Sequence, residues 1–193
     1  MSSNFYAFLS RMKYINRWGL MRNSLPENIQ EHSLQTAVIA HALAVINNEI
    51  YGGNINPDKA AAYAIFHDAA EIITGDMPTP VKYFSNEIRK AYNEVEDVAK
   101  GKLLSMLPQR FEKYYRNIFY QKENDIEMWK IIKAADGISA YIKCLEELRA
   151  GNSEFKAAKV SIEKKINNLR SKEAKYFMDE FIGGFSLPID EQN

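Results

Sequence analysis

The sequence is poor in the residues that crosslink a protein or anchor it in a membrane. Its single cysteine, Cys144, allows neither an intrachain disulfide nor a thiolate-rich zinc site. Its apolar runs fall well short of the ~20 residues that span a bilayer. The first residues show neither a leading basic region nor a small-residue cleavage site after an apolar stretch, so we expect no secretory signal. The expectation is a soluble cytoplasmic protein of 193 residues that can bury its own core.

Net charge is also absent, because 25 basic and 25 acidic residues cancel. This balance provides no global field that would draw the protein onto a nucleic-acid polymer or an anionic membrane, and we expect neither partner. Acidic residues are missing from residues 1–26, which carry four basic ones: Arg11, Lys13, Arg17 and Arg22. The segment is either a solvated face or one wall of a pocket for a small anion.

Strand-like alternation is scarcely visible, and helical periodicity fills most of the segments between the six prolines. The first long helix is expected to begin at about Asn28 and to stop at Gly52 and Gly53. Further helices are expected over about 57–74, 85–107, 128–148 and 154–181. Since there is no repeat, linker or low-complexity tract, the sequence predicts one all-α domain over residues 1–193.

The stretch AIFHDAAEIITGDMPTP, residues 64–80, places His67 and Asp68 side by side in an apolar run. Ionised groups are costly to bury unless something pairs with them, and a metal ion would be such a partner. Glu71 comes three residues after Asp68 and four residues after His67. If the segment is helical, Glu71 therefore shares a face with both side chains. Taken alone, the pair fits an exposed cap or a salt bridge better.

His32 and His41 lie nine residues apart on one predicted helix, and steps of about 100° put them on opposite faces. They cannot both join one site. His32 stands near the helix start in line with Thr36, whereas the apolar neighbours of His41 favour a hydrogen-bonded core histidine. Asp136, in IIKAADGISAYIKC, is a carboxylate in a buried-looking helix. Its structural alternative is pairing with Lys133 or with a neighbouring helix.

Taken together, His32, the adjacent His67 and Asp68, and Asp136 follow the order H…HD…D of the HD-domain metal-dependent phosphohydrolases. The runs INRWGLMRN, ENIQEHSLQ, FHDAAEIITGDMPTPVKYF and KAADGISAYIKCLEEL closely resemble the bacterial HD-domain 5'-deoxynucleotidases. The likeness extends over residues 5–185. It implies a helical HD-domain core, four metal ligands from separate helices, and a homodimer.

Two imidazoles and two carboxylates form a mixed N/O donor set that suits borderline ions such as Co²⁺, Mn²⁺, Zn²⁺ or Fe²⁺. We therefore expect one divalent transition metal as cofactor, with Glu71 beside it to hold and deprotonate the attacking water. By resemblance, Arg17 faces the phosphate and Trp18 packs against the sugar, although Trp18 could equally anchor the core. The resemblance implies this substrate-binding set: Arg17, Trp18, His32, Asp68, Asp76, Met77, Pro78 and Thr79.

These features predict a metal-dependent phosphatase that converts 2'-deoxyribonucleoside 5'-monophosphates to deoxynucleoside and phosphate. The alternatives within the superfamily are a phosphodiesterase and a nucleoside triphosphate hydrolase, which share the ligands and differ in the pocket. The alternative outside the enzymes is a metal-stabilised helical module that binds nucleotides without turnover. The native metal, the base preference, the proton donor to the leaving group, the dimer interface and the pathway cannot be derived from the sequence.

Overall fold

The computed structural model describes residues 3–192, and within them the only β-pairing is an isolated antiparallel bridge between Asn16 and Asn28. The α-helices are α1 (Phe5–Leu9), α2 (Ile29–Tyr51), α3 (Pro57–Ile65), α4 (Glu71–Thr74), α5 (Thr79–Lys82), α6 (Asn86–Ser105), α7 (Gln109–Phe119), α8 (Ile126–Arg149), α9 (Phe155–Asn168) and α10 (Lys172–Glu180). Short 3-10 helices are η1 (Ser10–Tyr14), η2 (Glu123–Asp125), η3 (Ile182–Ser186) and η4 (Ile189–Glu191). The all-α prediction is confirmed. In the described part of the chain, every helix is too short or too polar to cross a bilayer.

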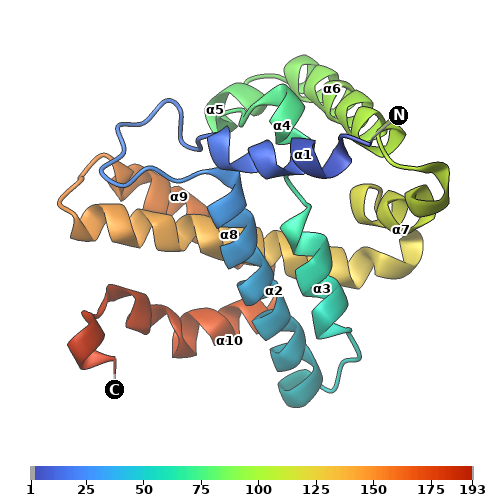
Figure 1. Cartoon of the computed structure of the whole chain (residues 1–193). Helices are drawn as coiled ribbons and strands as arrows, with labels where there is room; N and C mark the ends of the chain where they lie inside the picture. Colours follow the sequence, from blue (N-terminus) through green and yellow to red (C-terminus); the bar gives the residue numbers. More distant parts are fainter. Residues whose placement is uncertain (1–2, 193) are drawn as a thin grey trace.

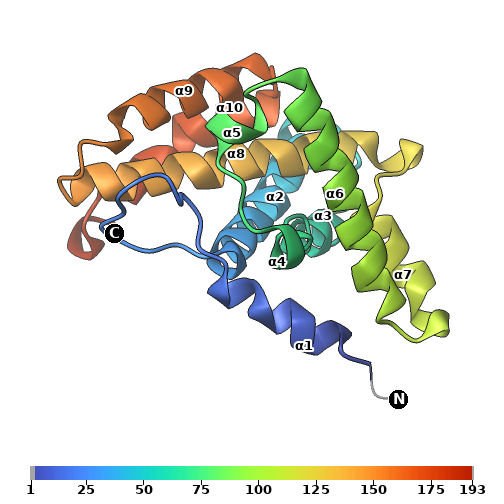
Figure 2. The same cartoon turned by 90° about the horizontal axis from the view of Figure 1, so that it is seen from above.

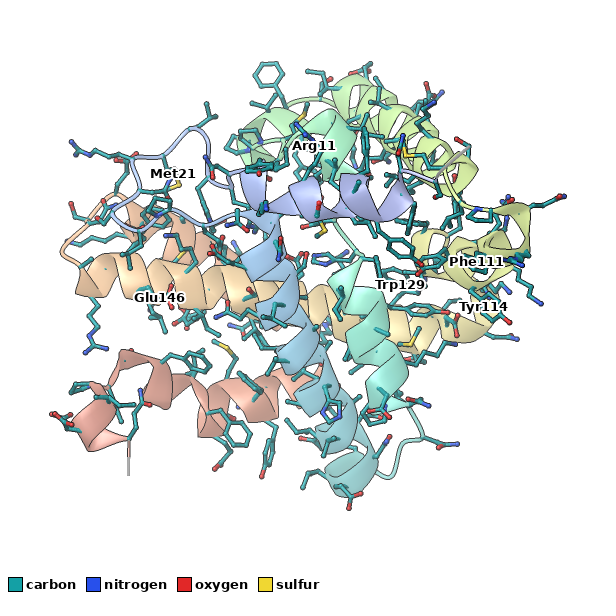
Figure 3. All side chains as sticks on the ribbon, viewed as in Figure 1. Arg11, Met21, Phe111, Tyr114, Trp129 and Glu146 are labelled. Carbon is teal, nitrogen blue, oxygen red and sulfur yellow. The ribbon has the colours of Figure 1, made fainter. Side chains whose placement is uncertain are left out.

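The long helix α8 runs across the molecule and organises the other helices (Figure 1). Helix α2 crosses α8 with α3 packed beside it, and α9 lies along α8 on another side. Figure 2 shows α6 and α7 side by side at the end of the molecule far from the C-terminus. Trp129 and Glu146 lie towards opposite ends of α8 (Figure 3). Because α2 crosses α8 between these two ends, a side chain near the middle of α8 is close to α2.

Two apolar cores meet where α2 begins and α3 ends. The larger core joins α2, α3, α8 and α10, and it includes Ala40 and Ala64. The smaller core joins α1, α6 and α7, and it includes Ile29 and Ala69. Residues 30–36 and 65–68 consequently lie between the cores. Packing in one core holds the chain before each segment, and packing in the other core holds the chain after it.

The first turn of α2 is fixed by local signals that the sequence displays. The Asn28 side chain accepts hydrogen bonds from the backbone N–H groups of Gln30 and Glu31 at 3.0 and 3.1 Å. The Glu31 carboxylate accepts in return from the Asn28 backbone N–H, completing a capping box. At the other end, Gly52 adopts the left-handed conformation with φ 67°, which glycine tolerates best. Both predicted ends of this helix are confirmed.

The helix predicted over 57–74 is interrupted. Helix α3 ends at Ile65, residues 66–70 form turns, and α4 begins at Glu71. The ring of Phe66 packs edge-on against Tyr115 and Phe119, which draws the chain towards the smaller core. Tertiary packing thus overrides the high helix propensity of this alanine-rich segment.

The helix predicted over 154–181 is also two helices. Arg170 adopts φ 52°, a left-handed conformation that ends regular helix. The hydroxyl of Ser171 accepts from the backbone N–H of Ala174 at 3.0 Å and caps the start of α10. The chain turns back here, so α9 and α10 pack on different sides of α8.

His41 is exposed, and the prediction that it lies in the core is wrong. Its side chain is 47% exposed and approaches the Asp58 carboxylate at 3.6 Å. The same face of α2 carries the exposed apolar side chains of Leu34, Val38 and Val45. This helix is apolar on more than its buried face, so apolar neighbours did not indicate burial. The predicted separation of His41 from His32 on opposite faces is confirmed.

Candidate active site

Three separate segments bring four side chains to one point between the two cores. His32 lies in the first turn of α2, where the capping box fixes it, and its side chain is fully buried. His67 and Asp68 lie in the turns between α3 and α4. Asp136 lies near the middle of α8. Sequence separation of up to about a hundred residues is thus closed by the crossing of α2 and α8.

The distances within this cluster are short. His32 Nε2 lies 3.0 Å from Asp136 Oδ1 and 3.6 Å from Asp68 Oδ2. His67 Nε2 lies 3.2 Å from Asp68 Oδ2 and 4.0 Å from Asp136 Oδ1. Potential ligand atoms of His32, His67 and Asp68 all lie within 4.8 Å of one another. The structure therefore brings together all four of the predicted ligands.

The proton on His67 can be located from its outer neighbour. Nδ1 lies 2.6 Å from the carbonyl oxygen of Ala64, and a carbonyl can only accept, so Nδ1 carries the proton. In the neutral ring, Nε2 then presents a lone pair to Asp68, and it is buried without a hydrogen-bond partner among the described residues. A lone pair that faces a carboxylate at 3.2 Å needs a cation between them. The residues present thus fit a divalent metal ion.

Charges within the cluster keep both carboxylates ionised. Burial alone would raise the pKa of Asp68, but His67, His32 and Arg17 outweigh burial and hold that pKa well below its usual value. Burial would likewise raise the pKa of Asp136, which a hydrogen bond and charge from His32 lower instead. Burial would lower the pKa of His67, but Asp68 and Asp136 raise it to about 9. The ion-free cluster therefore attracts positive charge, as protons or as metal.

Glu71 lies next to this cluster with its carboxyl group buried. Its backbone N–H donates to the Asp68 carbonyl at 2.9 Å, so a turn, and not the predicted continuous helix, sets its place. Its Oε2 is buried without a hydrogen-bond partner in the described residues. Burial, with the negative charges of Asp68 and Asp76, raises the pKa of Glu71 to about 10. A carboxyl group with such a raised pKa holds a proton at neutral pH while the cluster is free of metal.

Of the four basic residues in the acid-free segment, Arg17 is the one turned inward. Its Nε donates to Glu27 Oε2 at 2.9 Å, and its terminal nitrogen lies 3.4 Å from Asp68 Oδ2. The side chains of Arg11, Lys13 and Arg22 are exposed. Burial opposes the charge of Arg17, but Asp68 and Glu27 outweigh it and raise the pKa of this guanidinium. Arg11, Lys13 and Arg22 therefore form a solvated face, and Arg17 is the one basic residue of this segment that lies beside the cluster.

Trp18 is fixed on three sides. Its indole N–H donates to Glu27 Oε2 at 2.8 Å, its backbone N–H donates to Asp76 Oδ2 at 3.1 Å, and its ring lies 5.3 Å from that of Phe155. The residue adopts φ 61°, a conformation uncommon for a bulky side chain. Strain of this kind persists where surrounding contacts enforce it, and it gathers at functional sites.

The predicted substrate loop lies against this tryptophan through Asp76. Gly75 adopts φ 74°, which turns the chain after α4. Met77 and Pro78 are partly buried, and Thr79 is exposed at the start of α5. Burial, opposed by Arg17, raises the pKa of Asp76. The structure thus joins Trp18 and Asp76, while the neighbourhood of Met77, Pro78 and Thr79 is given only by chain adjacency.

Sequence reasoning missed three residues that contact this site. Glu27 binds both Arg17 and Trp18, and it is the first acidic residue after the acid-free segment, a signal that could have singled it out. Ser139 contacts the outer nitrogen of His32, and Gln35 in turn accepts a hydrogen bond from Ser139. No local pattern marks these two, because their bonds join α2 to α8.

Comparison with known proteins agrees with this arrangement. The family model described as "5'-deoxynucleotidase YfbR-like" matches residues 4–185. A 5'-deoxynucleotidase of Erwinia tasmaniensis is 49% identical over 189 residues, 98% of this chain and 96% of that protein. A 5'-deoxynucleotidase of Photorhabdus laumondii is 51% identical with the same coverage.

Solved structures show the same fold. An HD-domain phosphohydrolase from Listeria innocua superposes with a TM-score of 0.82 at 25% identity, covering 94% of this chain and 88% of that one. A cyanophage S-2L HD phosphohydrolase, bound to dA and one catalytic Zn²⁺ ion, has a TM-score of 0.66 at 19% identity, covering 92% and 95%. The resemblance predicted from the sequence is confirmed: the chain belongs to the YfbR-like family of 5'-deoxynucleotidases, which are phosphomonoester hydrolases.

Proposed function

We propose that the chain hydrolyses 2'-deoxyribonucleoside 5'-monophosphates to deoxynucleoside and phosphate, with one divalent metal ion held by His32, His67, Asp68 and Asp136. The observation that carries this proposal is the convergence of two imidazole nitrogens and two ionised carboxylates at 3.0 to 4.0 Å. The names of relatives at about half identity support the substrate class. The Zn²⁺ in the cyanophage neighbour supports a transition metal, with Co²⁺, Mn²⁺, Zn²⁺ and Fe²⁺ as candidates.

A metal ion bound there would act as a Lewis acid towards a phosphate oxygen. The Arg17 guanidinium lies beside the same point and is held by Glu27 through Nε. One terminal nitrogen contacts Asp68 at 3.4 Å, and the remaining N–H donors of the guanidinium can bind phosphate oxygens. Arginine suits this role for two reasons: its guanidinium stays charged even when it is partly buried, and its planar donors match the oxygens of a phosphate. We assign Arg17 to binding the phosphoryl group and to stabilising the charge that builds up in the transition state.

We assign Glu71 to the proton transfers. Its pKa of about 10 in the ion-free site depends partly on the negative charge of Asp68, so positive charge bound at Asp68 lowers it. Glu71 can then accept a proton from the attacking water and later return it to the 5'-oxygen that leaves. The water attacks phosphorus in line with that oxygen, without a covalent phosphoenzyme.

Trp18 and Asp76 are assigned to the sugar. The backbone N–H of Trp18 binds one oxygen of Asp76, which ties the loop after Gly75 to the segment that carries Arg17. The other carboxylate oxygen is available to a sugar hydroxyl. An indole against C2' leaves a ribose 2'-hydroxyl without room and without a partner, which favours the deoxynucleotide. Met77, Pro78 and Thr79 complete this proposed loop, and His32 and Asp68 face the substrate from the metal side.

The deciding experiment is phosphate release from matched pairs of deoxynucleoside and ribonucleoside 5'-monophosphates. The enzyme is first stripped with a chelator and then restored with one metal at a time. We expect no turnover of the stripped enzyme, recovery with transition metals, and preference for the deoxy member of each pair. Turnover that persists after complete metal removal would overturn the proposal.

The same assay separates the other classes considered. A panel with mono-, tri- and cyclic nucleotides distinguishes a monophosphatase from a nucleoside triphosphate hydrolase and from a phosphodiesterase. Nucleotide binding without any phosphate release would indicate a non-catalytic module. The buried, unpartnered carboxyl oxygen of Glu71 favours an enzyme, because a mere binding module gains nothing from it.

We make three broader proposals: a homodimer, which the family resemblance implies, and a cytoplasmic location and a single catalytic domain over residues 1–193, which both follow from the sequence. Light scattering of the purified protein tests the dimer, and cell fractionation tests the location. Limited proteolysis tests the single domain: if the proposal is right, the whole chain resists cleavage as one unit.

A further inference from the structure

His32 is held on its outer side by two consecutive hydrogen bonds. Its Nδ1 lies 3.0 Å from the hydroxyl oxygen of Ser139, and that hydroxyl donates to Gln35 Oε1 at 2.7 Å. Both His32 and Ser139 are fully buried. Bulk water therefore cannot replace the bond between His32 and Ser139.

The direction of these bonds follows from counting protons. A serine hydroxyl has a single proton, and Ser139 uses it on the Gln35 carbonyl oxygen. Ser139 can then only accept from His32, so Nδ1 of the imidazole must carry the ring proton. In the neutral ring the remaining nitrogen, Nε2, therefore presents its lone pair towards Asp136 and Asp68. The Thr36 hydroxyl is 3.5 Å from Nε2, at the outer limit of a hydrogen bond, and it does not compete strongly.

The two helices use the same spacing to build this arrangement. Helix α2 supplies His32 and, three residues later, Gln35. Helix α8 supplies Asp136 and, three residues later, Ser139. Residues three apart share a helix face, so each helix presents one cluster residue and one supporting residue to the other. The Ser139–Gln35 bond thereby joins α2 to α8 directly behind His32.

We propose that Gln35 and Ser139 are positioning residues that hold His32 in the tautomer with a free Nε2 lone pair, and that they raise the affinity of the cluster for a divalent metal. The inference rests on the proposed metal site. His67 obtains the same tautomer from a backbone carbonyl, which no substitution at that position can remove. His32 depends on side chains, so its tautomer is open to mutation. Outer partners of this kind typically change metal affinity by about 10- to 100-fold.

The test measures Co²⁺ affinity of the metal-stripped full chain by competition with a chelator, together with the His32 tautomer from ¹⁵N NMR. The variant Gln35→Met removes the acceptor, which frees Ser139 to donate to Nδ1 and shifts the proton to Nε2. We expect its Co²⁺ affinity to fall at least ~10-fold. Gln35→Glu keeps an acceptor and no donor, and should keep wild-type tautomer and nearly wild-type affinity. Ser139→Ala removes the hydroxyl and should weaken Co²⁺ as Gln35→Met does.

Ser33→Ala is the matched control. Ser33 is on α2 next to His32 and is 2% exposed, and its hydroxyl has no hydrogen-bond partner in residues 3–192. We expect its Co²⁺ affinity to match wild type. Because Gln35 is only partly buried, its variants should fold even where Ser139→Ala does not.

The outcomes separate this inference from the proposed function. If wild type binds Co²⁺ and both Gln35→Met and Ser139→Ala bind it equally well, the positioning role is wrong and the metal site stands. A Gln35→Glu variant with the opposite tautomer would also overturn it, because Gln35 would then have been a donor. If wild type binds no divalent metal, the proposed function itself fails.

Discussion

Glu27 holds Trp18 by its indole, with 2.8 Å between Glu27 Oε2 and Trp18 Nε1. The same oxygen accepts from Arg17 Nε at 2.9 Å. One partly buried carboxylate oxygen thus fixes the proposed phosphate-binding residue and the proposed sugar-binding residue together. The relationship also explains how a tryptophan remains at φ 61°, since its ring and backbone are both bonded.

Loss of the Glu27 charge should affect phosphate and sugar recognition together. In Glu27→Gln the amide can still accept from one donor, but it cannot satisfy Arg17 and Trp18 through one charged oxygen. We expect kcat/KM for deoxynucleotides to fall about 10-fold or more, and the preference for deoxy over ribo substrates to narrow. Paired kinetics on dAMP and AMP provide the measurement. A variant with normal values for both would show that this carboxylate is only a structural contact.

Trp18→Ala should narrow the deoxy-over-ribo ratio, chiefly by improving the ribonucleotide relative to the deoxynucleotide. The wild-type barrier combines a clash with an unpartnered hydroxyl and costs about 1 to 3 kcal/mol. Arg17→Ala is the comparison variant, because loss of a phosphate contact weakens both substrates alike. Melting curves accompany the kinetics. An unchanged ratio with a large loss of melting temperature would mean that the Phe155 contact of Trp18 serves packing and that the loop after Gly75 discriminates.

The ligand assignment predicts that His67→Ala or Asp136→Ala loses bound metal and activity together. His41→Ala is the matched control, since this histidine is exposed on the opposite face of α2. Elemental analysis after purification in the presence of metal measures occupancy. The thermal stabilisation that metal gives to wild type should also vanish in the two ligand variants, because an ion that binds only the folded chain adds its binding energy to folding. Metal lost from His41→Ala and kept by His67→Ala would refute the assignment.

Glu71→Gln should bind metal and nucleotide but turn over at least ~100-fold more slowly, in line with the loss of a positioned proton-transfer group. Calorimetry establishes binding, and single-turnover phosphate release establishes the rate. Glu146→Gln removes an exposed carboxylate on α8 and should leave turnover unchanged. Metal binding lost in Glu71→Gln would make Glu71 a ligand, and normal turnover would remove it from the mechanism.

Local signals in the sequence account for the parts of the fold that could be predicted. Asn28 and Glu31 form a capping box, and Gly52 ends α2, so both ends of this helix follow from short-range chemistry. The turns at 66–70 could not be predicted, because residues such as Ala69 and Ala70 favour helix. Their cause is the long-range packing of Phe66.

The same distinction holds for the site. The ligand residues were found because their types and order are unusual and match a family. The supporting residues were not found, because the Ser139–Gln35 bond spans 104 residues and follows only from the crossing of α2 and α8. His41 was instead assigned a burial that the structure does not show. Its position on the face away from His32 followed from helix periodicity, but its burial depended on which helices cover α2.

A buried ion pair ties the segment that carries Trp18 to α8. Lys143 and Glu147 are 2% and 0% exposed and bond to each other. Glu147 also accepts from the backbone N–H groups of Ser24 and Leu25 and from the side chain of Asn152 at 2.8 to 3.1 Å. The loop before α2 therefore depends on one carboxylate, and its removal leaves the buried Lys143 without its counter-charge and the donors of the loop without their acceptor.

Glu147→Ala should cost about 3 to 5 kcal/mol of unfolding free energy, because it leaves Lys143 as an unpaired buried charge. Urea unfolding measures this cost. The surface variant Asp179→Asn, which breaks the exposed pair with Lys175, should leave the unfolding midpoint unchanged and serves as control. A similar small effect for both variants would show that Glu147 is not a structural anchor.

The charge on Glu147 also predicts how stability depends on pH. Burial opposes ionisation, but Lys143, Asn152 and the backbone donors of Leu25 and Ser24 outweigh it and lower the pKa to about 2, from an ordinary 4.5. A carboxyl whose pKa is lower in the folded state stabilises that state above the unfolded pKa, and this contribution disappears as pH falls towards the folded pKa. Wild type should therefore exceed Glu147→Gln in unfolding free energy by a constant amount above about pH 5, and the gap should close between about pH 4.5 and 2. Urea unfolding of both proteins across this range measures the gap. A gap that stays constant down to pH 2 would show that the neutral hydrogen bonds of Glu147, and not its charge, hold the loop.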